Sequence, residues 1–210
     1  MNRLKPYSVG IIVVILVGCS AAPTKFVFRS NESPEEKIHY ISTDSPSFVM
    51  AIPGVNWNMR AVDYNHVVLT ATSGPRRIVN IFEYSDGSLH QRFYKPGTSE
   101  EQALKEYFRI ESEHHLSQIP GSTNKIISQN IPGINKPNLL WQIKWANQQT
   151  VWLTTSRDNH LIVVSWQDLD PPLVGEKRLE EIFRSLRFIS EEEEKIILQT
   201  LIVPEDVGRR

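Results

Sequence analysis

Three consecutive strand patterns between residues 139 and 166 constrain the fold of this chain most. Residues 139–146 alternate between apolar and polar side chains, as a strand with one buried face does. Residues 150–156 are expected to form the next strand, which runs back along the first. Residues 161–166 are apolar on both faces, which is typical of a central strand. Because only short polar turns separate the three segments, they predict an antiparallel meander.

Two amphipathic helices accompany the meander. The first is expected from about Thr98 to Pro120, with Thr98 and Glu101 at the spacing of a capping box. The second is expected from about Gly175 to Arg187. Its apolar residues recur at helical spacing and predict one buried stripe: Leu179, Ile182, Phe183 and Leu186.

Further β-rich segments precede the meander at residues 47–52, 66–72, 77–84 and 125–130. The order of strands, long helix, meander and closing helix predicts an α+β fold, in which helices pack against an antiparallel sheet. The domain is expected to span residues 38–189.

This layout resembles the PsbP/DcrB-like superfamily over about residues 45–188. The resemblance lies in the opening strand and turn at 48–53 with Trp57, in the meander, and in residues 182–188. It implies an α+β sandwich with no shared catalytic motif. It also implies an accessory, assembly or envelope protein, many of which are lipid-anchored.

The N-terminus predicts export. Arg3 and Lys5 precede an apolar run of about ten residues, which is shorter than the roughly 20 residues of a spanning helix. Residues 16–19 (Leu, Val, Gly, Cys) resemble the lipobox of bacterial lipoproteins. That resemblance implies that residues 1–18 are removed and that Cys19 receives lipid. The alternative is a small residue within a plain secretion signal.

If Cys19 is lipidated, the protein is anchored to the cell envelope. Ser20 after the cysteine fits sorting to the outer membrane, facing the periplasm, if the cell is Gram-negative. Residues 19–37 are expected to form the lipidated N-terminus and a tether. Within them, Phe26 to Phe28 are either part of that tether, an edge strand or a segment docked on the domain.

The acidic and apolar tail at residues 190–210 predicts a short helix. It either docks on its own domain or offers an apolar face to a partner. Cys19 is the only cysteine, so no internal disulfide can form. The net charge of −1 argues against nucleic-acid binding, which favours a basic face.

Few residues suggest chemistry. Glu111 and His115 are one helical turn apart and would supply two metal ligands, fewer than a zinc site needs. His66, His90 or His160 would have to supply a third. Ser122 and Lys125 match an S-x-x-K spacing, but Ser122 precedes a strand rather than opening a helix. We therefore expect no catalytic residues, no metal and no cofactor.

Trp141, Trp145 and Trp152 form the candidate binding surface. They either pack under the helices or line an apolar groove or partner platform. The sequence thus predicts a non-enzymatic, lipid-anchored envelope module that binds a partner protein or assists assembly of a complex. The alternative is a binder of a small apolar ligand or lipid between helix and sheet. A hydrolase would require a Ser, a His and an acid brought together by the fold.

Overall fold

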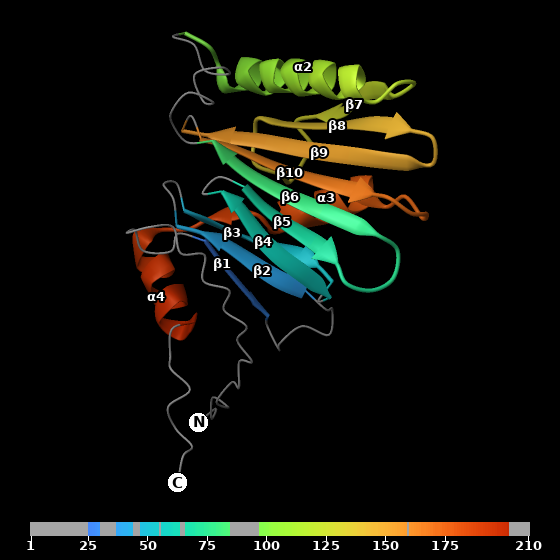
Figure 1. Cartoon of the computed structure of the whole chain (residues 1–210). Helices are drawn as coiled ribbons and strands as arrows, with labels where there is room; N and C mark the ends of the chain where they lie inside the picture. The colour runs from blue at the N-terminus through green and yellow to red at the C-terminus, as the bar shows by residue number, and fades with distance from the viewer. Residues whose placement is uncertain are drawn as a thin grey trace. The chain divides into compact units, whose positions relative to one another are not determined.

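The computed structural model describes residues 25–29, 37–43, 47–54, 56–63, 66–84, 97–158 and 160–201 (Figure 1). The chain forms two compact units. The larger unit is built from residues 56–186, and the smaller unit combines residues before Asn56 with residues from Arg187 onward. Each unit has an antiparallel sheet with a helix against it, so the expected α+β class is confirmed.

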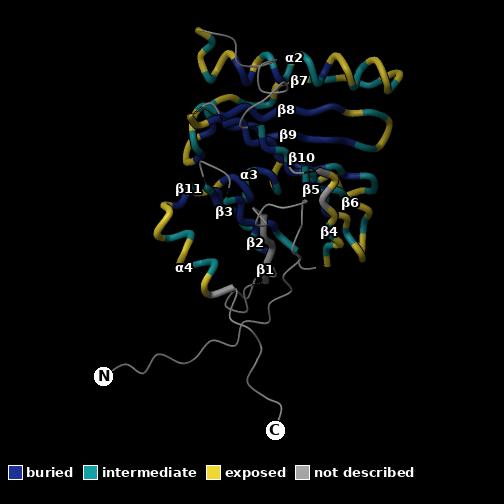
Figure 2. The backbone as a smooth tube through the Cα atoms, turned by 60° about the vertical axis from the view of Figure 1, so that its left-hand side comes forward, coloured by how far each residue is buried: buried dark blue, intermediate teal, exposed yellow. Residues whose placement is uncertain are grey.

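The larger unit contains a seven-stranded antiparallel sheet. In spatial order its strands are β4 (Trp57–Asp63), β5 (His66–Ala71), β6 (Arg77–Tyr84), β10 (His160–Asp168), β9 (Gln148–Arg157), β8 (Asn138–Trp145) and β7 (Thr123–Gln129). The predicted meander is β8–β9–β10, and β10 is the central strand, as its two apolar faces predicted. Strands β8, β9 and β10 are buried along most of their length (Figure 2).

Helix α2 (Glu100–Gln118) covers one face of this sheet, mainly over β7, β8 and β9. It begins one residue later than predicted, and the predicted cap at Thr98 is wrong. Ser99 is the N-cap: its hydroxyl accepts from the Gln102 backbone N–H at 3.3 Å, and Gln102 Oε1 accepts from the Ser99 N–H at 2.9 Å. The sequence could not distinguish the two positions, because Thr98 with Glu101 and Ser99 with Gln102 both have the spacing of a capping box.

Helix α3 (Gly175–Ser185) packs on β9 and β10. It lies on the face of the sheet opposite α2. Gly175 of α3 approaches Trp166 on β10 and Val151 on β9, and along these two strands both residues alternate with residues that lie beneath α2. The predicted stripe is confirmed: Leu179, Ile182, Phe183 and Leu186 are all buried.

The smaller unit has the strand order β1 (Lys25–Arg29), β2 (Lys37–Ser42), β3 (Phe48–Pro53) and β11 (Arg187–Phe188). Residues 26–28 lie in β1, which pairs with β2 at the edge of this sheet. Of the three alternatives predicted for residues 26–28 (tether, edge strand or docked segment), the structure shows the edge strand. Strands β2 and β4 were not predicted.

Helix α4 (Glu191–Leu201) packs against its own unit. Ile197 and Leu198 contact the buried cluster of Ile41, Val49 and Ile189. Two polar contacts reinforce this packing: Ser47 Oγ donates to Glu194 at 2.5 Å, and Arg187 pairs with Glu193. The described part of the C-terminal tail therefore docks on its own chain.

Within the described ranges, no helix combines the length and the apolar character that crossing a bilayer requires.

Candidate functional site

Three rings stand side by side on the α2 face of the larger sheet, and we call them the aromatic row: His66, Phe82 and Tyr84. His66 stacks on Phe82 with centroids 4.1 Å apart and planes 20° apart. Phe82 and Tyr84 are parallel within 4°, with centroids 6.2 Å apart. The register of β5 on β6 places His66 opposite Phe82, and strand alternation places Tyr84 on the same face. All three side chains are half-buried, so the row is partly accessible to solvent.

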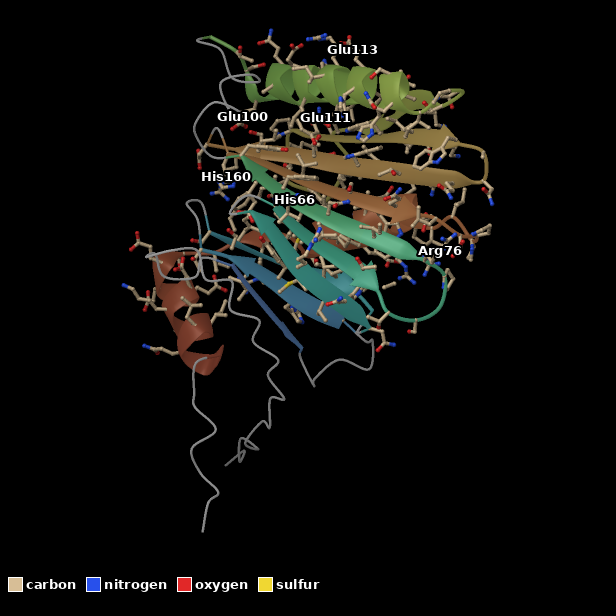
Figure 3. The ribbon with its side chains drawn as sticks, viewed as in Figure 1. His66, Arg76, Glu100, Glu111, Glu113 and His160 are labelled. Atoms are coloured by element: carbon tan, nitrogen blue, oxygen red, sulfur yellow. The ribbon has the colours of Figure 1, made fainter. Side chains whose placement is uncertain are left out.

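Hydrogen bonds fix the His66 end of the aromatic row. Figure 3 labels His66 among the side chains of the sheet. His66 Nε2 lies 3.1 Å from Asn80 Oδ1, and Asn80 Nδ2 donates to Ser165 Oγ at 3.0 Å. Because the amide nitrogen of Asn80 is used on Ser165, its oxygen must accept from His66. Nε2 therefore carries a proton, which it donates to Asn80.

This hydrogen-bond chain does not activate Ser165 as a nucleophile. A hydrolytic serine donates its proton to a base, which a third group orients. Here Ser165 Oγ accepts from an amide, and His66 turns its N–H toward Asn80 rather than a lone pair toward Ser165. The arrangement positions His66 and gives no support to the hydrolase alternative.

Tyr84 connects the aromatic row to α2. Its ring centroid lies 6.1 Å from that of Tyr107, a buried residue of the helix. Burial, followed by the electrostatic effects of Tyr84 and Glu111 and a hydrogen bond with Tyr84, raises the pKa of Tyr107 well above its ordinary value. Tyr107 therefore stays a neutral phenol. The contact of Tyr84 with Tyr107 holds one end of the aromatic row, and the hydrogen bond of His66 with Asn80 holds the other.

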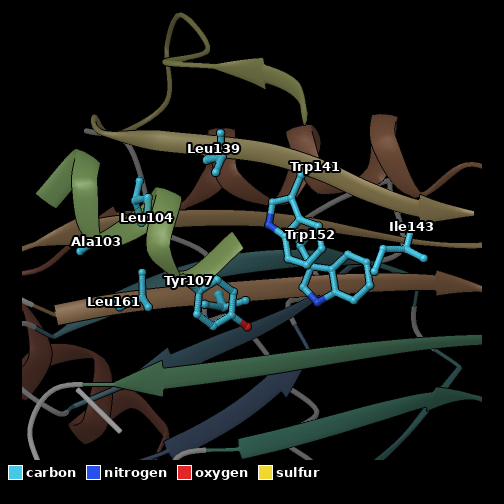
Figure 4. Close-up of a cluster of buried hydrophobic side chains, with 9 residues drawn as sticks. Ala103, Leu104, Tyr107, Leu139, Trp141, Ile143, Trp152 and Leu161 are labelled. Atoms are coloured by element: carbon cyan, nitrogen blue, oxygen red, sulfur yellow. The ribbon is translucent and has the colours of Figure 1, made fainter. Parts of the chain in front are cut away.

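Two of the three tryptophans of the predicted surface are core residues. Trp141 and Trp152 are cross-strand partners, and their indoles stack with centroids 4.1 Å apart and planes 3° apart (Figure 4). They are 0% and 4% exposed, under Leu104 and Tyr107 of α2. Trp141 Nε1 has no hydrogen-bond partner among the described residues. The pair fills the space between helix and sheet with side chains.

Trp145, the third tryptophan of the predicted surface, is half-buried at the end of β8. Its Nε1 donates to Gln148 Oε1 at 2.9 Å across the β8–β9 turn. The structure therefore does not bring the three tryptophans together on one exposed platform. A binding role for Trp145 stays a prediction.

Asp168, which the sequence did not single out, is a fully buried carboxylate at the end of β10. Oδ2 accepts from Gln149 Nε2 at 2.9 Å and from the backbone N–H groups of Val174 and Gly175 at 2.9 and 2.8 Å. Oδ1 accepts from Trp166 Nε1 at 2.9 Å and lies 3.3 Å from Arg77 Nε. Val174, the N-cap residue of α3, makes no side-chain cap, so Asp168 takes that role from a neighbouring strand.

A second buried acidic group, Glu83, lies beside His160 at the end of β6. Glu83 Oε2 and His160 Nε2 are 3.8 Å apart, and both residues are 2% exposed.

Glu111 and His115, which the sequence offered as two candidate metal ligands, have no third ligand beside them among the described residues. His115 Nε2 and Glu111 Oε2 are 4.0 Å apart on α2, and His115 also packs against Trp152. Burial, and then the neighbouring His114, lowers the pKa of His115. Across the part of the chain that the structure describes, no three His, Cys, Asp or Glu side chains are grouped so as to hold a metal ion. His90 lies outside that part.

The S-x-x-K match has a structural role instead. Ser122 Oγ donates to the Ile119 carbonyl at 2.7 Å, just past the end of α2, and Lys125 is exposed on β7. In the S-x-x-K motif the nucleophilic serine opens a helix, whereas Ser122 precedes strand β7, so it does not match the nucleophile of that motif.

Residues 1–18, Cys19 and the proposed tether up to residue 24 lie outside the described residues. Lipidation of Cys19 therefore stays a prediction from the sequence.

The fold that these elements define is a PsbP-like α+β fold, with antiparallel sheets and helices packed against them. The solution structure of cyanobacterial PsbP (CyanoP) from Synechocystis sp. PCC 6803 is similar at a TM-score of 0.50 and 11% identity, over 76% of this chain and 96% of that chain. The predicted PsbP-like resemblance is thus confirmed for the fold, and at this identity for the fold alone. A crystal structure from Bacteroides thetaiotaomicron VPI-5482 reaches a TM-score of 0.37 at 14% identity, over 70% of this chain and 46% of that chain, which is too low to support an argument. No family model and no curated protein matches the chain.

Proposed function

We propose that this chain is an exported envelope lipoprotein, anchored through lipid on Cys19, whose α+β domain binds a partner protein or assists assembly of a complex without catalysing a reaction. The observation that carries the proposal is the lipobox-like sequence at residues 16–19, behind a basic head and an apolar run. Each buried methylene of an acyl chain contributes roughly 0.8 kcal/mol, so two or more chains make the attachment lasting.

The use of the buried polar side chains supports a non-catalytic role. Asp168 caps α3, and Asn138 closes the loop before β8 through the Ile131 N–H and the Asn135 carbonyl. Asn80 and Ser165 orient His66. These side chains make hydrogen bonds that hold the fold, whereas a catalytic group must reach a substrate.

The PsbP-like fold is compatible with an accessory module, by analogy only, because one fold hosts many functions. The described part of the tail gives the proposal no support, because Ile197 and Leu198 of α4 pack on Ile41 and Val49 of its own unit. Deleting residues 191–210 would therefore remove core contacts and would not report on a partner.

Anchoring is tested by fractionating cells that express the full chain, Cys19→Ser or Ser20→Ala. The wild-type chain and Ser20→Ala should sediment with membranes, and their intact masses should show loss of residues 1–18 and gain of acyl groups. Cys19→Ser should lose the acyl mass and leave the membrane pool. If Cys19→Ser sediments as wild type does, the anchor is not on this cysteine.

Partner binding is tested by chemical cross-linking in intact cells, followed by purification and mass spectrometry. A single protein should be recovered in near-stoichiometric yield. The yield should fall in Cys19→Ser, because the anchor holds domain and partner at a high effective concentration. Recovery of no enriched protein from wild-type cells would count against the accessory role even if the anchor is confirmed.

The alternative function, a small apolar ligand held between helix and sheet, has less support. Trp141, Trp152 and Tyr107 occupy that interface in edge-to-face and stacked contacts. Native mass spectrometry of the purified protein would show a co-purified ligand if this alternative held.

A further inference from the structure

Strand β7 is the last strand of the seven-stranded sheet, and it has a neighbour on one side only. It pairs with β8, and no described strand pairs with its other side. In an antiparallel ladder, alternate residues turn their N–H and C=O groups away from the partner strand. The outer edge of β7 therefore presents backbone donors and acceptors to which a further strand can bind.

The pairing of β7 with β8 is regular only in the first half of β7. Residues 123–126 pair one to one with residues 144–141, and the register then shifts, so that Ile127 is an extra residue between Ile126 and Ser128. Such a bulge bends its strand. The straight part of the edge, to which another strand can pair, is therefore residues 123–126.

The two faces of this straight part differ in chemistry. Ile126 is 37% exposed and lies opposite Trp141, which α2 covers, so Ile126 is on the α2 face. Lys125 is on the other face by alternation, and Lys144, opposite Thr123, is its neighbour on that face. Both lysines are exposed, and neither forms an ion pair with a described carboxylate. The edge thus offers an apolar side chain on one face and two positive charges on the other.

The sequence around this edge also lacks acidic residues. Residues 114–157, which contain β7, β8 and β9, have no Asp or Glu, although the whole chain has 24 and a net charge of −1. On α2, Glu106 and Glu113 already pair with Arg109 of the same helix. The edge is therefore locally positive. It favours an acidic partner over a second copy of the chain, whose own lysines would approach these.

We propose that residues 123–126 of β7 bind an extended, acidic segment of a partner protein by strand addition. The segment continues the sheet through main-chain hydrogen bonds, places acidic side chains beside Lys125 and Lys144, and places an apolar side chain against Ile126. Lysines on an edge strand discourage pairing between copies of one chain, which agrees with a partner selected by charge. This inference rests on the partner binding of the proposed function, and it names the surface and the class of partner.

The test uses the purified full-length chain, with the capped peptide Gly-Glu-Val-Glu-Val-Glu-Gly as the probe. One control peptide has Lys in place of every Glu. The other keeps the sequence but is N-methylated at every Glu and Val, so that it keeps the charges and loses the N–H donors. Amide NMR signals of residues 123–126 should move saturably with the probe, and their amides that point away from β8 should exchange more slowly. No binding of the probe, or equal binding of either control, would overturn the proposal.

Two charge variants test the choice of partner. Lys125→Glu should weaken the probe roughly fivefold or more and improve binding of the lysine peptide, because an attraction is replaced by a repulsion. Raising the salt to about 1 M should narrow both differences. Lys195→Glu makes the same change at an exposed position of α4 and should leave the affinity unchanged. Wild-type affinity of Lys125→Glu for the probe would refute the site.

Failure of this inference can be told apart from failure of the proposed function. The peptide test requires neither the anchor nor a cellular partner. If cells that carry Lys125→Glu still give the cross-linked partner in full yield, the partner uses another surface. That result would overturn the assignment of this edge and leave the accessory role standing.

Discussion

Removing the buried carboxylate of Asp168 should be one of the most destabilising single changes in the larger unit. The two carboxylate oxygens accept four hydrogen bonds and lie beside the guanidinium of Arg77. In Asp168→Ala the backbone donors of Val174 and Gly175 and the indole of Trp166 lose their acceptor, and Arg77 loses its counter-charge. Breaking a buried ion pair costs about 3–5 kcal/mol. Asp168→Asn keeps one acceptor oxygen and should cost ~2–3 kcal/mol, the value of a charge-assisted bond.

Urea unfolding followed by tryptophan fluorescence would measure these losses. Hydrogen exchange would locate them, because the amides of Val174 and Gly175 should exchange faster before the rest of the sheet does. Asp158→Asn is the matched control. Asp158 is exposed in the β9–β10 turn and, among the described residues, pairs with Arg157 at 3.6 Å, so the change should alter stability by less than ~1 kcal/mol. An Asp168→Ala protein as stable as that control would refute the view that this carboxylate holds α3 to the sheet.

Three smaller predictions test other local contacts. Ser99→Ala should cost about 1 kcal/mol in urea unfolding and Thr98→Ala clearly less, because Ser99 is the N-cap of α2; the reverse order would contradict the observed cap. Gly175→Ala should cost roughly 1–3 kcal/mol, because a Cβ there would lie 3.1 Å from Trp166 and 3.2 Å from Val151 and Asp168; an unchanged midpoint would mean that these neighbours move apart easily. The hydrogen bonds from Arg76, and then its charge, lower the pKa of Asp170 to about 2. Since the folded-state pKa is lowered, this pair stabilises the protein above about pH 4 and is lost as the pH falls toward 2. A carboxyl NMR titration should show that midpoint, and Arg76→Gln should move it back up.

Local periodicity was enough to predict the parts of the fold that lie close together in the chain. The meander, the central position of β10 and the buried stripe of α3 each follow from alternation or helical spacing within one segment. Residues 57–63 also alternate, with Asn58 and Arg60 exposed and Trp57 and Met59 half-buried, so the signal for β4 was present in the sequence.

The smaller unit was harder to predict, because its sheet joins residues from both ends of the chain. Strand β11 pairs with β3 through Arg187 opposite Val49 and Phe188 opposite Phe48. No local pattern reports pairing across so long a separation. Two contacts of Asp168 were hidden for the same reason: Gln149 and Arg77 come from two other strands, and only the register brings them to Asp168.

The aromatic residues show why face assignments within single strands did not locate the site. Alternation places Trp152 on the face opposite Val151 and Leu153, but it does not say which face is covered. The register places Trp152 opposite Trp141, on the α2 face, so the two indoles stack within the core. The same rule places Asn80 on the parity of Phe82 and Tyr84, and the register with β5 then adds His66 to that face. Trp141 and Trp152 therefore pack beneath α2, in the core. Which of these side chains are covered depends on where α2 lies, mainly over β7, β8 and β9, and the alternation within a single strand carries no information about that.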